Sequence, residues 1–293
     1  MTVPRHEFLA VIRETLTLFY KEAGELLREH DNVPIAGSQA AKEVAEDPSP
    51  DWIVLAQSIS GQLVEFGGEH VTGLVKLITE PVEVIACWSL LRAMIEGCAF
   101  GVWLTDPAID AHVRAGRVLA LHYEGLTQQI RFGRAGQYEP DRIKMAEDRI
   151  DEIEQQALAL GFAAVQDKNK RRIGIGQKMP TATDLVRDML DEEAMYRMLS
   201  GVTHAQSWAI MGLGYTAAKD PKVNIGATKL TMKYEKDVNM VMMMSLGVKT
   251  ASTFARLLRS RSEYYGWNTR KFVNLFELVF DKLKAPEKTR FWR

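Results

Sequence analysis

Residues 81–104 read PVEVIACWSLLRAMIEGCAFGVWL, a strongly apolar stretch whose only charges are Glu83, Arg92 and Glu96. Apolar residues cover most sides of the helix that this stretch predicts, and a helix that is apolar all round is buried all round. The stretch is long enough to span a bilayer, but Arg92 and Glu96 lie near its middle, where each would be costly in lipid. We therefore expect a central core helix and no membrane association.

Both cysteines of the chain, Cys87 and Cys98, lie in this stretch. They are eleven residues apart, so they share one helix face at a separation of about 16 Å, which excludes a disulfide between them. Free buried thiols suit a reducing compartment. The N-terminal residues include acidic side chains and lack the apolar core of a signal peptide. We therefore expect a cytoplasmic protein.

Helix signals in the rest of the chain predict an all-α fold, a multi-helix bundle in a single domain over residues 1–293. The composition, 46% hydrophobic and 26% charged, is that of a globular protein. Further helices are predicted from apolar spacing and capping residues, at about 4–30, 51–78, 107–136, 140–161, 191–215, 236–265 and 269–284, with a short one from Thr183. Residues 163–180 are interpreted as a basic loop, and β-branched alternation predicts a short extended or β segment near 220–234.

The charge is unevenly distributed along the chain. The net charge is −1, so no overall field attracts nucleic acid or membrane. From Lys249 to Arg293, however, eleven Lys or Arg face four Asp or Glu, and the chain ends in a basic tail, 285–293. Such a run either meets a polyanion or forms a solvated helix face, and the sequence leaves both interpretations open.

Thr105-Asp106-Pro107 ends the apolar helix and starts the next one after a short link. A short link predicts an antiparallel helical hairpin as the centre of the bundle. In that register Glu96 lies level with Arg114 and Arg117, while Arg92 lies within i,i+4 reach of Glu96. These four residues are predicted to form a buried charge cluster, because an unpaired charge in the core would be strongly destabilising. The cluster either fixes how the helices dock or, with three arginines against one glutamate, binds an anion.

A second candidate site lies in MYRMLSGVTHAQSW, residues 195–208. Arg197 and His204 are seven residues apart, which is two helical turns, so both lie on one side of a helix. Ser200, Gly201 and Trp208 belong to the same face. Gly201 would let another backbone or a ligand approach closely.

The spacing Arg-x6-His on a late helix of an all-α protein resembles the Arg-x(4–6)-His motif of HEPN-type helical nucleases. The resemblance covers Arg197 to His204 and departs from the usual pattern at Met198, where the family often has a polar residue. An Arg-Ala-x-x-Glu helix that ends in Trp-Leu-x-Asp-Pro, followed by Leu-Ser-x-x-x-His, is also similar to uncharacterised bacterial helical proteins, which implies a fold and no activity.

The HEPN resemblance implies a metal-independent ribonuclease in which Arg197 and His204 are the catalytic pair, Ser200 supports them, and a homodimer brings two copies onto RNA. A histidine can exchange a proton with the reacting oxygens near neutral pH, and an arginine can stabilise charge on the scissile phosphate. The alternative interpretation is a non-catalytic helical scaffold or small-ligand binder. In that case His204 caps or bridges a neighbouring helix and Arg197 pairs with a carboxylate such as Glu193.

Other chemistries lack their motifs. A di-iron bundle needs Glu-x-x-His on two helices, and none of the six histidines has a glutamate three residues before it. There is no Cys-x-x-Cys, no Gly-x-Ser-x-Gly and no nucleotide-binding glycine loop. We therefore expect no metal and no cofactor. The methionines of residues 240–244 fit either plain core or an adaptable apolar pocket.

Overall fold

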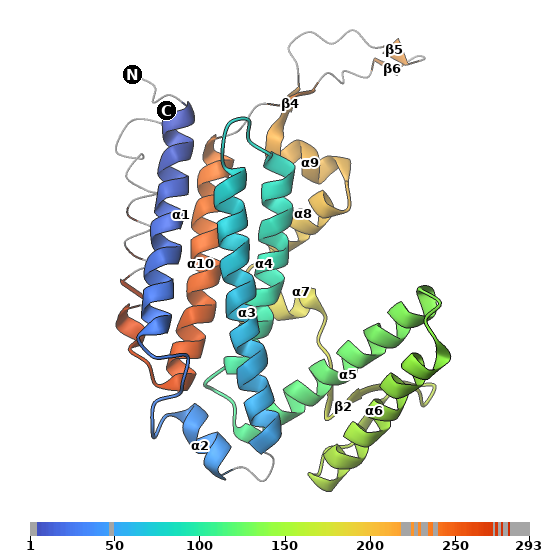
Figure 1. The fold of residues 1–293 in the computed structure, drawn as a ribbon. Coiled ribbons are helices and arrows are strands. Elements are labelled where there is room, and N and C mark those ends of the chain that lie inside the picture. The colour runs from blue at the N-terminus through green and yellow to red at the C-terminus, as the bar shows by residue number, and fades with distance from the viewer. Residues whose placement is uncertain are drawn as a thin grey trace.

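The structure is a computed structural model that describes residues 5–46, 50–217 and 240–271, the short runs 224–225, 228–229, 234–236 and 273–274, and residues 277 and 281. It confirms the all-α bundle (Figure 1). The helices are α1 (Arg5–Arg28), α2 (Gln39–Glu46), α3 (Pro50–Leu77), α4 (Val84–Thr105), α5 (Ala111–Ala135), α6 (Pro140–Ala159), α7 (Ala182–Leu185), the π-helical turn η1 (Val186–Leu190), α8 (Glu193–Thr203), α9 (Ser207–Gly214) and α10 (Met240–Tyr265).

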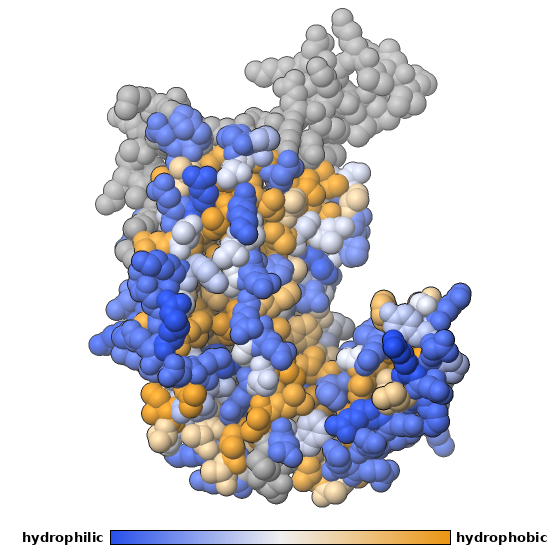
Figure 2. Space-filling model, in the orientation of Figure 1, coloured by the Kyte–Doolittle hydropathy of each residue, from blue (hydrophilic) through white to orange (hydrophobic). Residues whose placement is uncertain are grey.

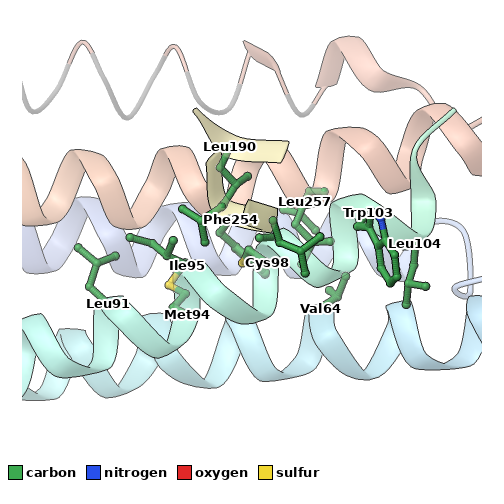
Figure 3. Close-up of a cluster of buried hydrophobic side chains, with 14 of the residues drawn as sticks. Val64, Leu91, Met94, Ile95, Cys98, Trp103, Leu104, Leu190, Phe254 and Leu257 are labelled. Carbon is green, nitrogen blue, oxygen red and sulfur yellow. The ribbon is translucent and has the colours of Figure 1, made fainter. Parts of the chain in front are cut away.

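The long helices α1, α3, α4 and α10 stand side by side and form the body of the molecule, with α7, α8 and α9 along one side of α4 (Figure 1). Apolar side chains of α4 point toward α3 and α10 and toward η1 (Figure 3). The labelled part of this core contains Val64, Leu91, Met94, Ile95, Cys98, Trp103, Leu104, Leu190, Phe254 and Leu257. The apolar stretch therefore forms the central core helix, as its composition predicts.

Close packing between α4 and α10 depends on a small residue. A side chain on Gly101 would place its Cβ 2.4 Å from Leu257 Cδ1, which is closer than any real contact. Glycine therefore lets the leucine of α10 press against the backbone of α4. Cys87 and Cys98 both lie buried in α4, and no disulfide joins them.

By length and composition α4 is the one helix among the described residues that could cross a membrane. Of its most apolar 18-residue window, 56% is buried inside the molecule. Its neighbours in the bundle therefore cover much of the surface that a bilayer would otherwise meet.

The hairpin predicted between the apolar helix and its successor is wrong. α5 turns away from α4 and, with α6, forms an arm that projects from the body (Figure 1). The link between α4 and α5 is five residues, 106–110, because the helix begins after Asp110, whose side chain accepts the N–H of Val113 at 2.8 Å. The helix that packs antiparallel to α4 is α3, which directly precedes it in the chain, and not α5. Hydrophilic residues cover much of the arm on the face drawn in Figure 2.

Residues 163–180, which the sequence suggested to be a loop, contain a small antiparallel sheet of β1 (Ala164–Gln166), β2 (Arg172–Ile175) and β3 (Gln177–Lys178), in that order. The sheet packs beside the arm and contacts both of its helices. Arg172 pairs with Asp151 and Glu154 of α6, and its carbonyl accepts the Tyr123 hydroxyl of α5 at 2.8 Å. Short strands also occur near 220–234, as predicted: β4 (Tyr215–Ala217) pairs with β7 (Tyr234–Lys236), and β5 (Asn224–Ile225) with β6 (Thr228–Lys229).

Between α1 and α3 the chain also forms the short helix α2, which is not among the predicted helices. Two further predictions concern residues that the structure describes only in part or not at all. The helix predicted at 269–284 lies mostly outside the described residues, and the basic tail 285–293 lies wholly outside them. One hydrophobic cluster includes buried residues from the body and from the arm. The single domain remains a prediction.

Candidate functional site

The helix that carries Arg197 and His204 is shorter than predicted. We expected one helix from 191 to 215, but α8 ends at Thr203 and α9 starts at Ser207. His204 is the residue at the C-terminal cap of α8, and its backbone N–H still bonds to the carbonyl of Ser200 at 3.0 Å. Arg197 and His204 therefore remain two turns apart along one helix, with His204 at its end.

The break after α8 is a Schellman turn. Gln206 N–H bonds to the carbonyl of Gly201 at 2.8 Å and Ala205 N–H bonds to that of Val202 at 3.0 Å, the paired bonds that define the motif. Ala205 occupies the left-handed position with φ of +53°. Glycine usually fills that position. Because this chain has alanine there, the sequence did not predict the turn.

This turn folds α9 back over Gly201. A Cβ on Gly201 would lie 2.9 Å from Cζ2 of Trp208 and 2.8 Å from Cβ of Ala209. The predicted close approach at Gly201 is therefore made by the chain's own tryptophan. The Trp208 indole N–H donates to Gln206 Oε1 at 2.8 Å, which orients the ring, and the residue is 61% exposed.

Gly201 lies four residues after Arg197 and three before His204, so Trp208 sits over the face that these two residues share. Arg197 and His204 are both exposed, and Ser200 is half-buried. We call Arg197, Ser200, His204 and Trp208 the α8 face. It combines a cation, a hydroxyl, an imidazole and an accessible aromatic ring.

Arg197 has a carboxylate partner on the same helix. Its Nε and Nη2 both lie 2.8 Å from Glu193 Oε1. This is the pairing that the alternative interpretation anticipated. The side chains of Arg197 and Glu193 are 64% and 32% exposed, and an ion pair of that exposure contributes only about 0–1 kcal/mol. An incoming anion can therefore compete for the guanidinium at little cost.

Tyr196, the neighbour of Arg197, points to the opposite side and joins the α8 helix to α4. Its hydroxyl donates to Glu96 Oε2 at 2.8 Å and accepts from Arg92 Nη2 at 3.1 Å, while Arg92 and Glu96 pair at 3.5 Å. Burial, and next the hydrogen bond to Glu96, raise the pKa of Tyr196 to about 12. The pairing of Arg92 with Glu96 agrees with the sequence prediction, and Tyr196 is a member that the prediction missed.

Arg114 and Arg117 do not meet Glu96, so the predicted four-residue cluster is wrong. Arg114 is fully buried and pairs with Glu43 of α2, Nε to Oε2, at 2.8 Å. It also donates to the carbonyls of Leu104, Asp106 and Ile109 in and before the α4–α5 link. These bonds hold the link in the bent form that directs α5 away from α4.

Arg114 has further partners within the fold, so its guanidinium is not available to bind an anion. Its guanidinium lies 3.9 Å from the centre of the Tyr264 ring, and the Tyr264 hydroxyl donates to Glu43 Oε2 at 2.7 Å. Arg117 pairs with Asp106 at 3.5 Å and donates to the carbonyl of Trp103. The geometry of both arginines is therefore that of a structural tie between α2, α4, α5 and α10.

His122 of α5 lies edge-on to Trp52 of α3 at 6.2 Å between ring centres. Burial, and next the charge of Arg149, lower its pKa. No group of three or more His, Cys, Asp or Glu side chains within the described ranges is placed to hold a metal ion.

Comparison of the chain with protein-family models, with curated proteins and with solved structures gives no match. Sequence reasoning found the residues of the α8 face, including Trp208. It missed Gln206, Tyr196 and Glu43, because only the turn after α8 and the position of α2 bring these side chains to their partners.

Proposed function

We propose that this protein is a metal-independent ribonuclease of the kind that the HEPN resemblance implies, with Arg197 and His204 as its catalytic pair. The observation that supports the proposal is the position of Trp208, exposed and packed over Gly201 between the two. Aromatic rings beside basic side chains form the usual platform for single-stranded nucleic acid, with bases on the ring and phosphate at the cation. The α8 face offers both elements, with the basic side chains on α8 and the aromatic ring on α9.

The reaction needs a cation at the phosphate and two groups that transfer protons, and this face carries one guanidinium and one imidazole. The 2′-oxygen of a ribose attacks the adjacent phosphorus, the bond from phosphorus to the 5′-oxygen breaks, and a 2′,3′-cyclic phosphate forms. One proton leaves the 2′-hydroxyl and one proton reaches the departing 5′-oxygen. In this proposal His204 takes the first or supplies the second, and Arg197 stabilises charge on the non-bridging phosphate oxygens.

One imidazole serves only one of these two proton transfers at a time. A homodimer that pairs two α8 faces would supply the second imidazole, and the family resemblance implies this assembly. The exposure of Trp208 supports it, because an aromatic ring that is 61% exposed favours burial against RNA or a second subunit. Cytoplasmic RNA is the substrate class that this proposal requires.

A second candidate is a non-catalytic helical scaffold or small-ligand binder. The pairing of Arg197 with Glu193 favours it, because the guanidinium then has a partner without RNA. The structural role of Arg114 and Arg117 favours it as well, since neither of them is available to bind an anion. The two candidates differ in what they require of His204.

The test is degradation of a single-stranded RNA with EDTA present, by the wild type and by the variants His204→Ala and Arg197→Ala. We expect each variant to lose at least about 100-fold in rate, the lower range for removing a general acid–base. Trp208→Ala should weaken RNA binding by about 1–3 kcal/mol, the contribution of one stacked base.

Matched controls separate chemistry from stability. Arg259→Ala removes an arginine of nearly the same exposure that pairs with Glu263 at 2.8 Å on α10, and His6→Ala removes an exposed histidine of α1. Both should cleave as the wild type does. Equal rates for wild type and His204→Ala, or no cleavage by either, would favour the scaffold.

A further inference from the structure

Arg261 of α10 is a buried arginine with neutral partners. The residue is 2% exposed. Its Nη1 donates to Ser60 Oγ and to the carbonyl of Gln57, and its Nη2 donates to Asn32 Oδ1 at 3.0 Å. Within the described part of the chain it forms no ion pair with a carboxylate. A buried cation normally has an anionic partner, and the Arg261 guanidinium lacks one among the described residues.

The guanidinium also has unused donors. An arginine carries five N–H groups, and three of them are accounted for by Ser60, Gln57 and Asn32. The Nε–H is buried without a hydrogen-bond partner, and one hydrogen of Nη2 remains. The ring centres of Tyr265 and Trp267 lie 4.2 Å and 5.8 Å from the guanidinium carbon, so aromatic faces add negative potential beside it. Burial lowers the pKa of Arg261.

Arg261 lines an open pocket of about 410 Å³ between α3, the loop after α1 and the end of α10. Gly61 forms part of its wall. A Cβ on Gly61 would lie 3.5 Å from Arg261 Nη2 and 3.6 Å from Asn32 Nδ2. Because Asn32 Oδ1 accepts from Arg261, its Nδ2 is a donor, so two N–H donors converge on the space that the missing side chain leaves.

The walls of this pocket are fixed by bonds across the fold. Ile35 N–H bonds to the carbonyl of Tyr265 at 3.0 Å, and the Trp267 indole N–H donates to the carbonyl of Val33 at 2.8 Å. His30 stacks on Trp267 with ring centres 5.1 Å apart and planes 6° from parallel. The loop that carries Asn32 is therefore tied to α10 before any ligand arrives, which favours binding by a preformed site.

We propose that this pocket binds a small organic carboxylate, whose oxygens accept hydrogen bonds from Arg261 Nη2 and Asn32 Nδ2. A single guanidinium matches a single negative charge. Glu65 also lines the pocket, and its carboxylate opposes a phosphate dianion more strongly than a monoanion. Val33, Pro34 and Val54 supply apolar surface for the rest of such a molecule.

The test uses the full chain and sodium benzoate, with neutral benzamide as its isostere and inorganic phosphate as the competing anion. The Nε–H signal of Arg261, assigned in a ¹H–¹⁵N NMR spectrum by its loss in Arg261→Lys, reports binding directly. We expect benzoate to shift this signal saturably, and benzamide and phosphate to bind at least about tenfold more weakly.

Gly61→Leu is the decisive variant, because it fills the space beside the two donors and leaves Arg261 in place. Gly61→Ala is its control, since its Cβ makes only ordinary contacts with the two donors. We expect the leucine variant to fold, by circular dichroism, and to bind benzoate at least about tenfold more weakly than the alanine variant. The proposal is overturned if benzoate gives no saturable shift, if benzamide or phosphate binds as well, or if Gly61→Leu binds benzoate as tightly as the wild type. None of these outcomes bears on RNA cleavage.

Discussion

Arg114 and Glu43, which are 71 residues apart in the chain, form a buried ion pair in which Nε donates to Oε2 at 2.8 Å. The pair joins α5 to α2, and its arginine also holds the link that leads out of α4. The direction in which the α5–α6 arm leaves the body therefore depends on a contact between a charged residue of α5 and a glutamate in a short helix.

Replacement of Glu43 by alanine should be strongly destabilising. It would leave the Arg114 charge buried without its partner, which typically costs about 3–5 kcal/mol of unfolding free energy. Urea denaturation measures the loss. Asp148→Ala is the control, because it breaks an exposed pair with Lys144 and should cost under about 1 kcal/mol. Equal effects of the two substitutions would show that the buried pair is not a principal tie.

Ala205→Gly should stabilise the protein. Ala205 holds φ of +53° at the end of α8, a conformation that glycine adopts without the steric penalty of a Cβ. We expect a gain of about 0.5–1 kcal/mol in urea denaturation, after the greater flexibility of glycine in the unfolded chain is subtracted. A loss of stability would mean that the left-handed turn is not formed in solution.

Gly201→Ala should act in the opposite direction. Its new Cβ would overlap Trp208 and Ala209, so the turn between α8 and α9 must shift. Overpacking of this kind usually costs about 1–3 kcal/mol. The displaced indole should also change its fluorescence, and Trp208→Phe identifies that contribution among the six tryptophans. An unchanged spectrum would contradict the packing of Trp208 on Gly201.

Cys98 should not react with a thiol reagent such as DTNB while the protein is folded. Burial raises the pKa of the Cys98 thiol, which removes the reactive thiolate, and the side chain is inaccessible. Both Cys98 and Cys87 should react once the chain is unfolded in guanidinium. Rapid labelling in native buffer would mean that α4 is not enclosed by its neighbours.

Tyr196 should make stability depend on alkaline pH. Because its folded pKa is raised from 10.0 to about 12, its contribution is fully present below pH 10 and is lost as pH rises toward 12. Tyr196→Phe should lose about 1.5–3 kcal/mol at neutral pH, the usual contribution of a hydrogen bond to a charged group. The difference between wild type and variant should shrink between pH 10 and 12, and a constant difference would count against the bond to Glu96.

The helices of the fold were predictable from the sequence where a local pattern of apolar residues determines them. Apolar spacing placed α1, α3, α4, α6 and α10 within a few residues of their true bounds, because each buries a continuous face. The direction of α5 was not predictable from a short link, since Arg114 meets Glu43 only after α2 folds against the body.

The candidate site was likewise predictable only where a local pattern determines it. The spacing of Arg197 and His204 places both on one helix, and this needs only the helical period. The turn at Ala205, which sets Trp208 over Gly201, uses alanine where glycine is the recognisable signal. Tyr196 was hidden because a contact between α8 and α4 is a property of packing and not of any local pattern.

The ribonuclease proposal is tested most directly by one cleavage measurement with EDTA present. An RNA oligonucleotide is compared with the same sequence carrying 2′-O-methyl groups, for wild type and His204→Ala. We predict that wild type cleaves only the unmodified RNA and leaves a 2′,3′-cyclic phosphate, while His204→Ala leaves both intact. Cleavage of the methylated RNA, undiminished cleavage by His204→Ala, or no cleavage by the wild type would contradict it.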